Sequence, residues 1–384
     1  MSYQYFIPIK KSCALLLLTL SFFSCSRREN FDIIVEERIQ IDTTKLTEEE
    51  ITFTPIGTVE ILNSAKIDDN YILVNDAGAN RVYLMNKEAK LLYEWSFTNN
   101  IGNDVYLLPN GKLLASLEAD EPKIPLGGKG GKIQFIEPDN TPTWQFDYSS
   151  IDGETHHITK SNFGIVSENP NLIDINYSLK DTSLPDVKGD IMHANAIAYD
   201  EDNDVIMLSV NFYSEVWVID HSTTTEEASS HLGGNYNKGG DLIYRFGNPE
   251  TYENTSGTRL FHNNHYPNLL KGENKGKLLI FSNGNDIEQS AVYELELPST
   301  YSLQPNFNNE PTVTWSFTDP DLYSGKVSGA VPLENGNILI TEGDFGFWEV
   351  TRDKEVVWKF SAPGFYWRGY NYLKNSPEIK KLGL

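Results

Sequence analysis

Residues 193–249 read HANAIAYDEDNDVIMLSVNFYSEVWVIDHSTTTEEASSHLGGNYNKGGDLIYRFGNP. His193 stands at the start of a strand, and two apolar strands follow over Asp204–Val210 and Glu215–Asp220, with a turn signal between them. A third strand over Leu242–Gly247 closes the stretch after a glycine-rich polar loop. The pattern predicts an antiparallel meander, which is the unit from which β-propeller blades are built.

The rest of the chain contains weaker copies of this meander, at a spacing of roughly 40–55 residues. They cover residues 71–97, 103–148, 156–178, 263–317 and 328–360. Asn-Gly pairs, the strongest short hairpin signal, occur at Asn110, Asn283 and Asn335. No segment has sustained helical periodicity. The sequence therefore predicts an all-β fold, a six-bladed β-propeller of four-stranded antiparallel blades.

Trp-x-Phe recurs in the last strand of four copies. We assign this stripe to core packing between neighbouring blades. The tryptophans are Trp95, Trp144, Trp315 and Trp358.

Composition limits the partners of the chain. Its 384 residues carry a formal net charge of −23, which opposes binding to nucleic acid, because that affinity comes largely from Lys and Arg on phosphates. There are two cysteines, Cys13 and Cys25, and the first lies in a segment that we expect to be removed. The mature chain then has no disulfide, no cysteine-ligated zinc and no cysteine nucleophile.

Residues 1–24 are expected to form a lipoprotein signal peptide. Lys10 and Lys11 precede an apolar run, Cys13–Phe23, that is too short to span a bilayer. The ending Phe-Phe-Ser-Cys resembles a bacterial lipobox, with Cys25 as the lipidated residue; the alternative is an ordinary signal peptide cut nearby. Residues 25–50 would be the lipidated cysteine and a polar tether, and residues 51–384 the propeller domain. This predicts a protein on the periplasmic side of a bacterial cell envelope, anchored in the membrane through Cys25.

Histidines stand where the inner strands of a propeller begin, around a channel that all blades share. His193 and His265 hold that position in two copies, His156-His157 is the candidate in the poor third copy, and Asn103-Asp104 holds it in the second. A lone histidine is more often structural, but equivalent positions in several blades favour a common site.

Familiar cofactor and metal motifs are not found. The glycine-rich run over 127–132 lacks the Walker spacing, since Ile133 follows its last lysine. His262 and His265 are three apart, so in a strand they would point to opposite faces. The sequence predicts neither a metal nor a cofactor.

Several stretches resemble the bacterial arylsulfotransferase family. They include HANAIAYDEDNDVIMLS, SEVWVIDHSTTTEEA, GGDLIYRFGNP, LLIFSNGN and SGAVPLENGNILITEG, and the resemblance runs from about residue 100 to the end. It implies a six-bladed propeller in the periplasm that moves a sulfuryl group from an aryl sulfate to a phenol without a nucleotide donor. It also implies that a histidine takes the group covalently while other histidines move protons.

The resemblance places candidate catalytic residues at His193, His265 and Arg368. The family's His-x-Asn is matched by His193 with Asn195, and its Gln-His by Asn264 with His265. Arg368 would hold the sulfuryl oxygens.

Candidate substrate-binding residues accompany these three. They are Asn195, Asn211, Asn264, Tyr366 and His157.

The chain departs from the family at three places. Ser209-Val210-Asn211 stands where Ser-Ser-Arg is frequent, and Ser290-Ala291 where Ser-Arg is usual. Tyr366-Trp367-Arg368-Gly369 stands where the well-studied branch has His-Tyr-Arg-Ala, whose histidine carries the sulfuryl group. The carrier is then His265 or His193, transfer is direct, or Tyr366 carries the group after activation.

Two other functions stay open. The lost arginines are compatible with a catalytically degenerate propeller that binds a small molecule, glycan or protein in its funnel. The fold alone also allows a quinone-cofactor or sugar-active propeller. Arg245 and Arg259 could replace the missing arginines, although we interpret both as surface or strand-edge residues.

Overall fold

The computed structural model describes residues 53–117, 132–136, 142–147, 150–151, 164–174, 176–177 and 192–384. The expected signal peptide, Cys25, the tether and His157 lie outside these residues.

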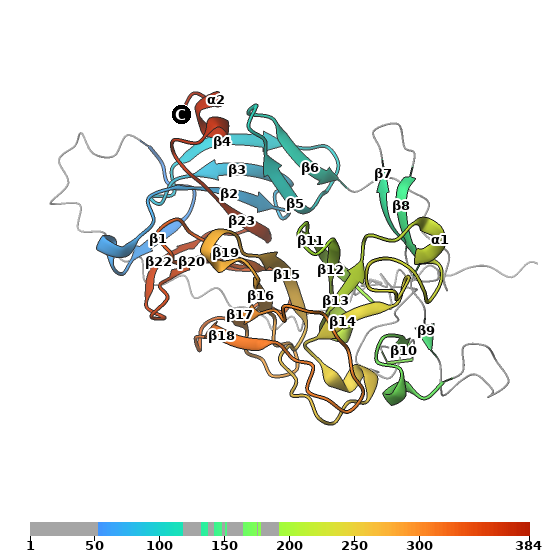
Figure 1. Cartoon of the computed structure of the whole chain (residues 1–384). Coiled ribbons are helices and arrows are strands. Elements are labelled where there is room, and N and C mark those ends of the chain that lie inside the picture. Colours follow the sequence, from blue (N-terminus) through green and yellow to red (C-terminus); the bar gives the residue numbers. More distant parts are fainter. Residues whose placement is uncertain are drawn as a thin grey trace, which may run out of the picture.

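Four antiparallel sheets carry the fold (Figure 1). The first joins β23 (Tyr366–Tyr372), β2 (Tyr71–Asp76), β3 (Arg81–Met85) and β4 (Leu91–Ser96) in that order. The second joins β11 (Ala194–Asp200), β12 (Val205–Val210), β13 (Glu215–Asp220) and β14 (Leu242–Phe246). The third joins β15 (Asn264–Leu269), β16 (Lys277–Ser282), β17 (Ala291–Glu296) and β18 (Thr312–Phe317). The fourth joins β19 (Gly329–Pro332), β20 (Ile338–Glu342), β21 (Gly346–Val350), β22 (Val356–Ser361) and β1 (Thr58–Ile61).

Three two-stranded sheets complete the described strands. They are β5 (Ile101–Leu107) with β6 (Leu113–Leu117), β7 (Lys132–Ile136) with β8 (Pro142–Asp147), and the parallel pair β9 (Ser150–Ile151) with β10 (Ile173–Asp174).

The all-β, propeller-like ring is confirmed, but the described residues form four complete blades, not the six predicted. The predicted copy at 103–148 gives two separate pairs, β5–β6 and β7–β8, and the copy at 156–178 gives only β10 among the described strands. Many residues of these two predicted copies lie outside the described ranges, so the correction from six blades to four applies to the described residues.

The two ends of the described chain close the ring. β23, near the C-terminus, pairs with β2 near the N-terminus, so that Asn75 lies opposite Arg368. β1 adds a fifth strand to the sheet of β19–β22 by pairing with β22. Each closing sheet therefore combines N-terminal and C-terminal strands, which protects edges that an open ring would expose.

The first strands of neighbouring sheets lie against one another towards the middle of the molecule (Figure 1). β11 contacts β15, β15 contacts β19, β19 contacts β23, and β23 contacts β5. Polar residues at the starts of these strands are thereby gathered around one centre.

The predicted packing role of the Trp-x-Phe stripe is confirmed at two blade junctions. Trp358 is fully buried, stacks on Phe360, and donates from Nε1 to the carbonyl of Lys87 at 2.8 Å. Trp315 stacks on Phe317 and donates to the carbonyl of Arg352, also at 2.8 Å. Each indole thus fills the gap between two sheets and satisfies its N–H on the neighbouring one.

The helices are short. α1 (Thr225–Ala228) begins with a capping box in which Thr224 and Glu227 exchange hydrogen bonds, and α2 (Pro377–Lys381) begins with a proline. Single 3-10 turns occupy Ser64–Lys66, Val166–Glu168, Asn211–Tyr213, Pro249–Tyr252 and Gly272–Asn274. Among the described residues, no helix has the length and apolar character needed to cross a membrane.

Candidate active site

The start of β15 is tied to the start of β11 by amide side chains. The carbonyl of Asn264 accepts from Asn195 Nδ2 at 2.7 Å, and from Ser209 Oγ and Asn211 Nδ2 at 3.3 Å each. Asn264 Nδ2 in turn donates to Ser209 Oγ at 2.8 Å. These contacts use the amides of all three predicted substrate-binding asparagines to hold two blades together, and all three side chains are buried.

His265 follows this junction and is 4% exposed. Its Nδ1 lies 2.6 Å from Oδ1 of Asn283. Burial, with the positive charge of Arg368 as the next cause, lowers the pKa of His265 to about 3. The imidazole is therefore neutral at neutral pH, and within the described chain no hydrogen bond reaches its Nε2.

Arg368 is the buried cation of the site, at 1% exposure. Its Nη1 donates to the carbonyls of Ser328 at 2.5 Å and Trp367 at 2.7 Å. The guanidinium stacks over the ring of Tyr266, 4.5 Å from its centroid. Gly329 makes room for this stack, because a Cβ there would lie 3.0 Å from Tyr266 Cδ1 and 3.2 Å from Arg368 Cδ.

The other edge of this guanidinium has no partner. Nε and Nη2 of Arg368 are both buried and make no hydrogen bond to the described residues. The nearest carboxylate oxygen, Oδ1 of Asp104, is 3.9 Å from Nε, which is beyond hydrogen-bond range. Asp104 instead accepts from the hydroxyl of Tyr370 at 2.9 Å. Two parallel N–H groups are thus left free for a pair of anionic oxygens.

His193 lies on the exposed side of the same site. Its ring stacks on Phe212 with centroids 4.8 Å apart, and its charge is close enough to contribute to the lowered pKa of His265. Its backbone has φ +49°, and Tyr266, beside His265, has φ +57°. Left-handed backbone at residues other than glycine is strained and concentrates at functional sites.

The structure thus brings together His193, His265 and Arg368, with Asp104 beside them. Tyr366 is elsewhere: it is 1% exposed, packs against Phe347, and donates its hydroxyl to the carbonyl of Ala362 at 3.1 Å.

Neither of the two other arginines that were considered joins this site in the described structure. Arg245 is fully buried in a two-point ion pair with Glu215, at 2.8 and 2.5 Å. Arg259 is held between its bond to the carbonyl of Phe261 and the carboxylate of Asp286.

Metal ligands do not gather in the described ranges, where no three His, Cys, Asp or Glu side chains could share an ion. His262 and His265 each direct Nδ1 to a different residue of one loop, Asp286 and Asn283. They do not converge.

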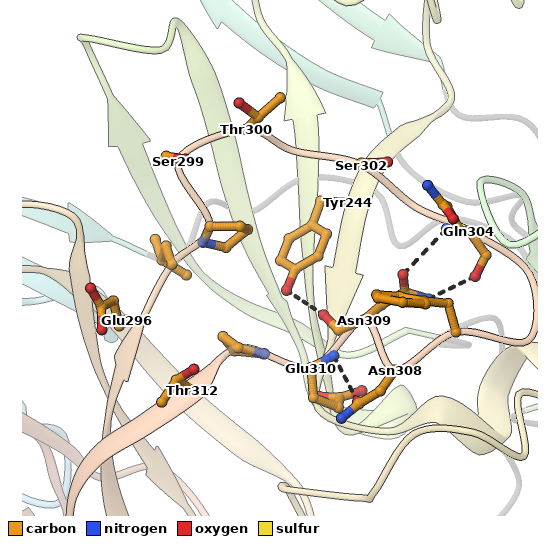
Figure 2. A pocket seen from close by; sticks show the side chains of 14 residues that line it. Tyr244, Glu296, Ser299, Thr300, Ser302, Gln304, Asn308, Asn309, Glu310 and Thr312 are labelled. Carbon is orange, nitrogen blue, oxygen red and sulfur yellow. Dashed lines mark hydrogen bonds between the residues drawn. The ribbon is translucent and has the colours of Figure 1, made fainter.

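A separate cavity of about 520 Å³ lies between Tyr244 of β14 and the loop that joins β17 to β18 (Figure 2). The hydroxyl of Tyr244 donates to the carbonyl of Asn309, whose Nδ2 donates to the carbonyl of Gln304 at 2.9 Å. None of the candidate residues lines it.

The sequence matches the family described as Arylsulfotransferase (ASST) over residues 68–361, well over half of the chain. The chain belongs to the arylsulfotransferase family. No curated protein matches it.

Solved structures match this arylsulfotransferase-family chain at low identity. A protein of unknown function from Bacteroides caccae is 13% identical, with 79% of this chain and 98% of that one covered and a TM-score of 0.42. A putative 6-phosphogluconolactonase from Bacteroides fragilis is 11% identical, with 81% and 72% covered and a TM-score of 0.31. Dihydro-heme d1 dehydrogenase NirN is also 11% identical, with 84% and 78% covered and a TM-score of 0.27. All three TM-scores are below 0.5.

Sequence reasoning missed Asn283 and Ser328. Asn283 precedes a glycine, so the sequence indicates only a turn there. In the structure Gly284 has φ +74° and makes the turn, while the side chain of Asn283 contacts His265. Ser328 carries no sequence signal, because it acts through its carbonyl oxygen.

Proposed function

We propose that this protein is an aryl-sulfate sulfotransferase that moves a sulfuryl group from an aryl sulfate to a phenolic acceptor, without a nucleotide donor or other cofactor. The observation that carries the proposal is the unpartnered Nε–Nη2 edge of buried Arg368 beside neutral His265. Membership of the arylsulfotransferase family supports this class of reaction.

Arg368 is suited to hold the sulfuryl oxygens. An aryl sulfate presents three oxygens that share negative charge, and two parallel N–H groups match two of them. The charge on the group in flight is spread over the same oxygens, so a fixed cation stabilises it without reorganisation. The Nε and Nη2 atoms are buried, and the carboxylate of Asp104, whose side chain is 28% exposed, lies 3.9 Å from Nε. We therefore expect Asp104 to move when the donor binds.

His265 is suited to take the sulfuryl group. Its Nε2 lone pair attacks sulfur, the bond from sulfur to the aryl oxygen breaks, and its electron pair leaves on the phenolate. Nδ1 keeps its proton throughout, bonded to Asn283. Because the pKa of His265 is about 3, the ring is available as a nucleophile but not as an acid near neutral pH.

His193 is suited to move the protons, since it is exposed and lies beside His265. In the first half-reaction it gives its proton to the leaving phenolate. In the second, it takes the proton of the acceptor phenol, whose oxygen attacks sulfur while the Nε2–sulfur electron pair returns to His265. Overall, the aryl sulfate donor and the acceptor phenol become the free phenol of the donor and the sulfate ester of the acceptor.

The test is release of a coloured phenol from an aryl sulfate by residues 26–384, with and without an acceptor phenol. We expect acceptor-dependent release that falls at least about 100-fold in His265→Gln and Arg368→Met. His193→Gln should be rescued in part by donors with more acidic leaving phenols, because these need less protonation. If the folded protein binds sulfate or donor but does not turn the donor over, the result would instead support a catalytically degenerate propeller that binds a ligand in its funnel.

We also propose a lipid anchor at Cys25 and a periplasmic location. This rests on the Phe-Phe-Ser-Cys ending of the apolar run, which lies outside the described residues. Globomycin-sensitive labelling with a fatty-acid analogue, lost in Cys25→Ala, would test it.

A further inference from the structure

We infer that Asn283 is the positioning residue that fixes His265 in the tautomer with Nδ1 protonated, and so directs its chemistry to Nε2. The inference deepens the function proposed above and rests on it for its catalytic consequence. The tautomer itself can be measured without any activity.

The orientation of the Asn283 amide is fixed by the two hydrogen bonds that its Nδ2 group donates. Nδ2 donates to the carbonyls of Ser324 at 2.8 Å and Val327 at 3.2 Å. These oxygens can only accept, so the amide cannot flip, and Oδ1 must face His265. An Oδ1 atom can only accept, so Nδ1 of His265 carries the hydrogen.

The backbone of Asn283 is fixed as well. Its N–H donates to the carbonyl of Asn263 at 2.8 Å, and its carbonyl accepts from Ser290 Oγ at 2.6 Å. The residue is fully buried. Ser290 therefore fixes the backbone of Asn283, whose side chain contacts His265.

The turn that anchors Asn283 also anchors Arg368. Val327 and Ser328 have φ +52° and +83°, and a β-branched residue at positive φ is a true outlier. Gly343 N–H donates to the hydroxyls of Ser324 and Ser328, at 3.2 and 3.1 Å, and holds this conformation. The carbonyl of Val327 then faces Asn283, and the carbonyl of Ser328 faces Arg368. One strained turn sets the orientation of both the imidazole and the guanidinium.

The chain offers a matched control. His262 Nδ1 lies 2.6 Å from Asp286 Oδ1, the same contact to the same loop, but on the exposed side. If a loop partner of a histidine were important only for local stability, Asn283→Ala and Asp286→Ala would have similar effects on transfer.

The experiment is nitrogen NMR of the protein labelled with 15N-histidine, from pH 5 to 8, with the signal of His265 assigned by His265→Gln. We expect the wild type to show Nδ1 protonated and Nε2 bare over the whole range. In Asn283→Ala the two tautomers should mix, and the kcat of transfer should fall about 100-fold with little change in KM. In Asn283→Asp the tautomer should be retained and the pKa of His265 should rise, because a carboxylate replaces an amide at Nδ1. Asp286→Ala should leave the His265 signal and kcat unchanged.

A wild-type spectrum with Nε2 protonated would overturn the inference, and that result needs no variant to fold. So would an unmixed tautomer in folded Asn283→Ala. If the tautomer is as expected but no donor is turned over, the proposed function fails while the role of Asn283 in orienting His265 stands.

Discussion

Asp104 Oδ1 lies 3.9 Å from Nε of Arg368, close enough for electrostatic attraction but too far for a hydrogen bond. The two residues come from β5 and β23, which contact each other although they lie far apart in the sequence. Asp104 balances the buried charge of Arg368 while leaving its donor edge unsatisfied. The same carboxylate would repel an incoming sulfate ester.

Asp104→Asn should therefore tighten the binding of anionic donors. Removing one like charge at this range is worth about 1 kcal/mol, or roughly fivefold in the dissociation constant. Asparagine keeps an oxygen that can accept from Tyr370, so the local structure should be retained. Calorimetric titration with inorganic sulfate measures the change, and Asp321→Asn on an exposed loop is the control. Weaker sulfate binding in Asp104→Asn would contradict this role.

The lowered pKa of the buried His265 imidazole should be visible in how the free energy of unfolding depends on pH. Because the folded state lowers the pKa of His265 from 6.5 to about 3, the unfolded chain binds a proton in this window and the folded chain does not. The free energy of unfolding then rises with pH from about 3 to 6.5. Above that range both states hold a neutral imidazole, and His265 no longer makes stability depend on pH. Urea unfolding of His265→Gln should show a flatter rise than the wild type between pH 4 and 6.5. Equal slopes would mean that the imidazole titrates normally in the folded protein.

Much of the fold could be predicted from the sequence. The strands β2–β4, β11–β14 and β15–β18 follow alternating or continuous apolar residues bounded by turn signals, which are local properties. β23 was not predicted as a strand, because its partner β2 lies at the other end of the chain. Register across such a distance depends on the complete ring, which no window of sequence contains.

The candidate site could be predicted in part from residues that begin inner strands, and Arg368 from the family resemblance. His193 and His265 were found in this way, since every inner strand begins at the same channel. Tyr366 and Arg368 are two apart in β23 and would share a face in a regular strand, but the register shifts between their partners Asp76 and Asn75. Such an irregularity changes the direction in which a side chain points, and here it places Tyr366 in the core and Arg368 at the site.

The blade junctions allow a comparison of two ion pairs in which a buried carboxylate meets a buried or a partly exposed cation. Lys87 Nζ lies 2.5 Å from Glu349, and Arg352 Nη2 lies 2.5 Å from Glu294. The Lys87 side chain is 7% exposed, whereas that of Arg352 is 39% exposed. Both cations lie over the tryptophan of their junction, and both carboxylates are buried. The sites differ in the exposure of the cation and in a second cation, because Lys277 Nζ also lies 3.2 Å from Glu294.

Lys87→Met should destabilise the protein far more than Arg352→Met. Removing Lys87 leaves the buried carboxylate of Glu349 without its cation, which typically costs about 3–5 kcal/mol. Removing Arg352 should cost about 1 kcal/mol or less, because this cation is partly exposed and Glu294 keeps its contact with Lys277. Urea unfolding at pH 7 measures both. The double variant Lys87→Met with Glu349→Gln should recover part of the loss. Similar losses in the two single variants would show that neither the burial of the cation nor a second cation governs the contribution of these pairs.

Glu310, beside the separate cavity, should make the protein less stable as pH rises. Its Oε2 accepts from Gly247 N–H at 2.7 Å, while Oε1 is buried and has no partner in the described structure. Burial raises the pKa of this carboxyl from 4.5 to about 8, against the smaller opposing effect of its bond to Gly247. The folded chain thus keeps a proton that the unfolded chain has lost, and the free energy of unfolding falls between about pH 4.5 and 8.

Glu310→Gln removes this titration and keeps an acceptor for Gly247. Relative to the wild type, the variant should gain about 2–4 kcal/mol between pH 5 and 9, whatever its stability at pH 5. Glu296→Gln is the matched control, because it lines the same cavity but its side chain is exposed. Its unfolding free energy should follow the wild-type curve. A Glu310→Gln curve parallel to the wild type would mean that the carboxyl is ionised in the folded protein and that its buried oxygen has found a partner.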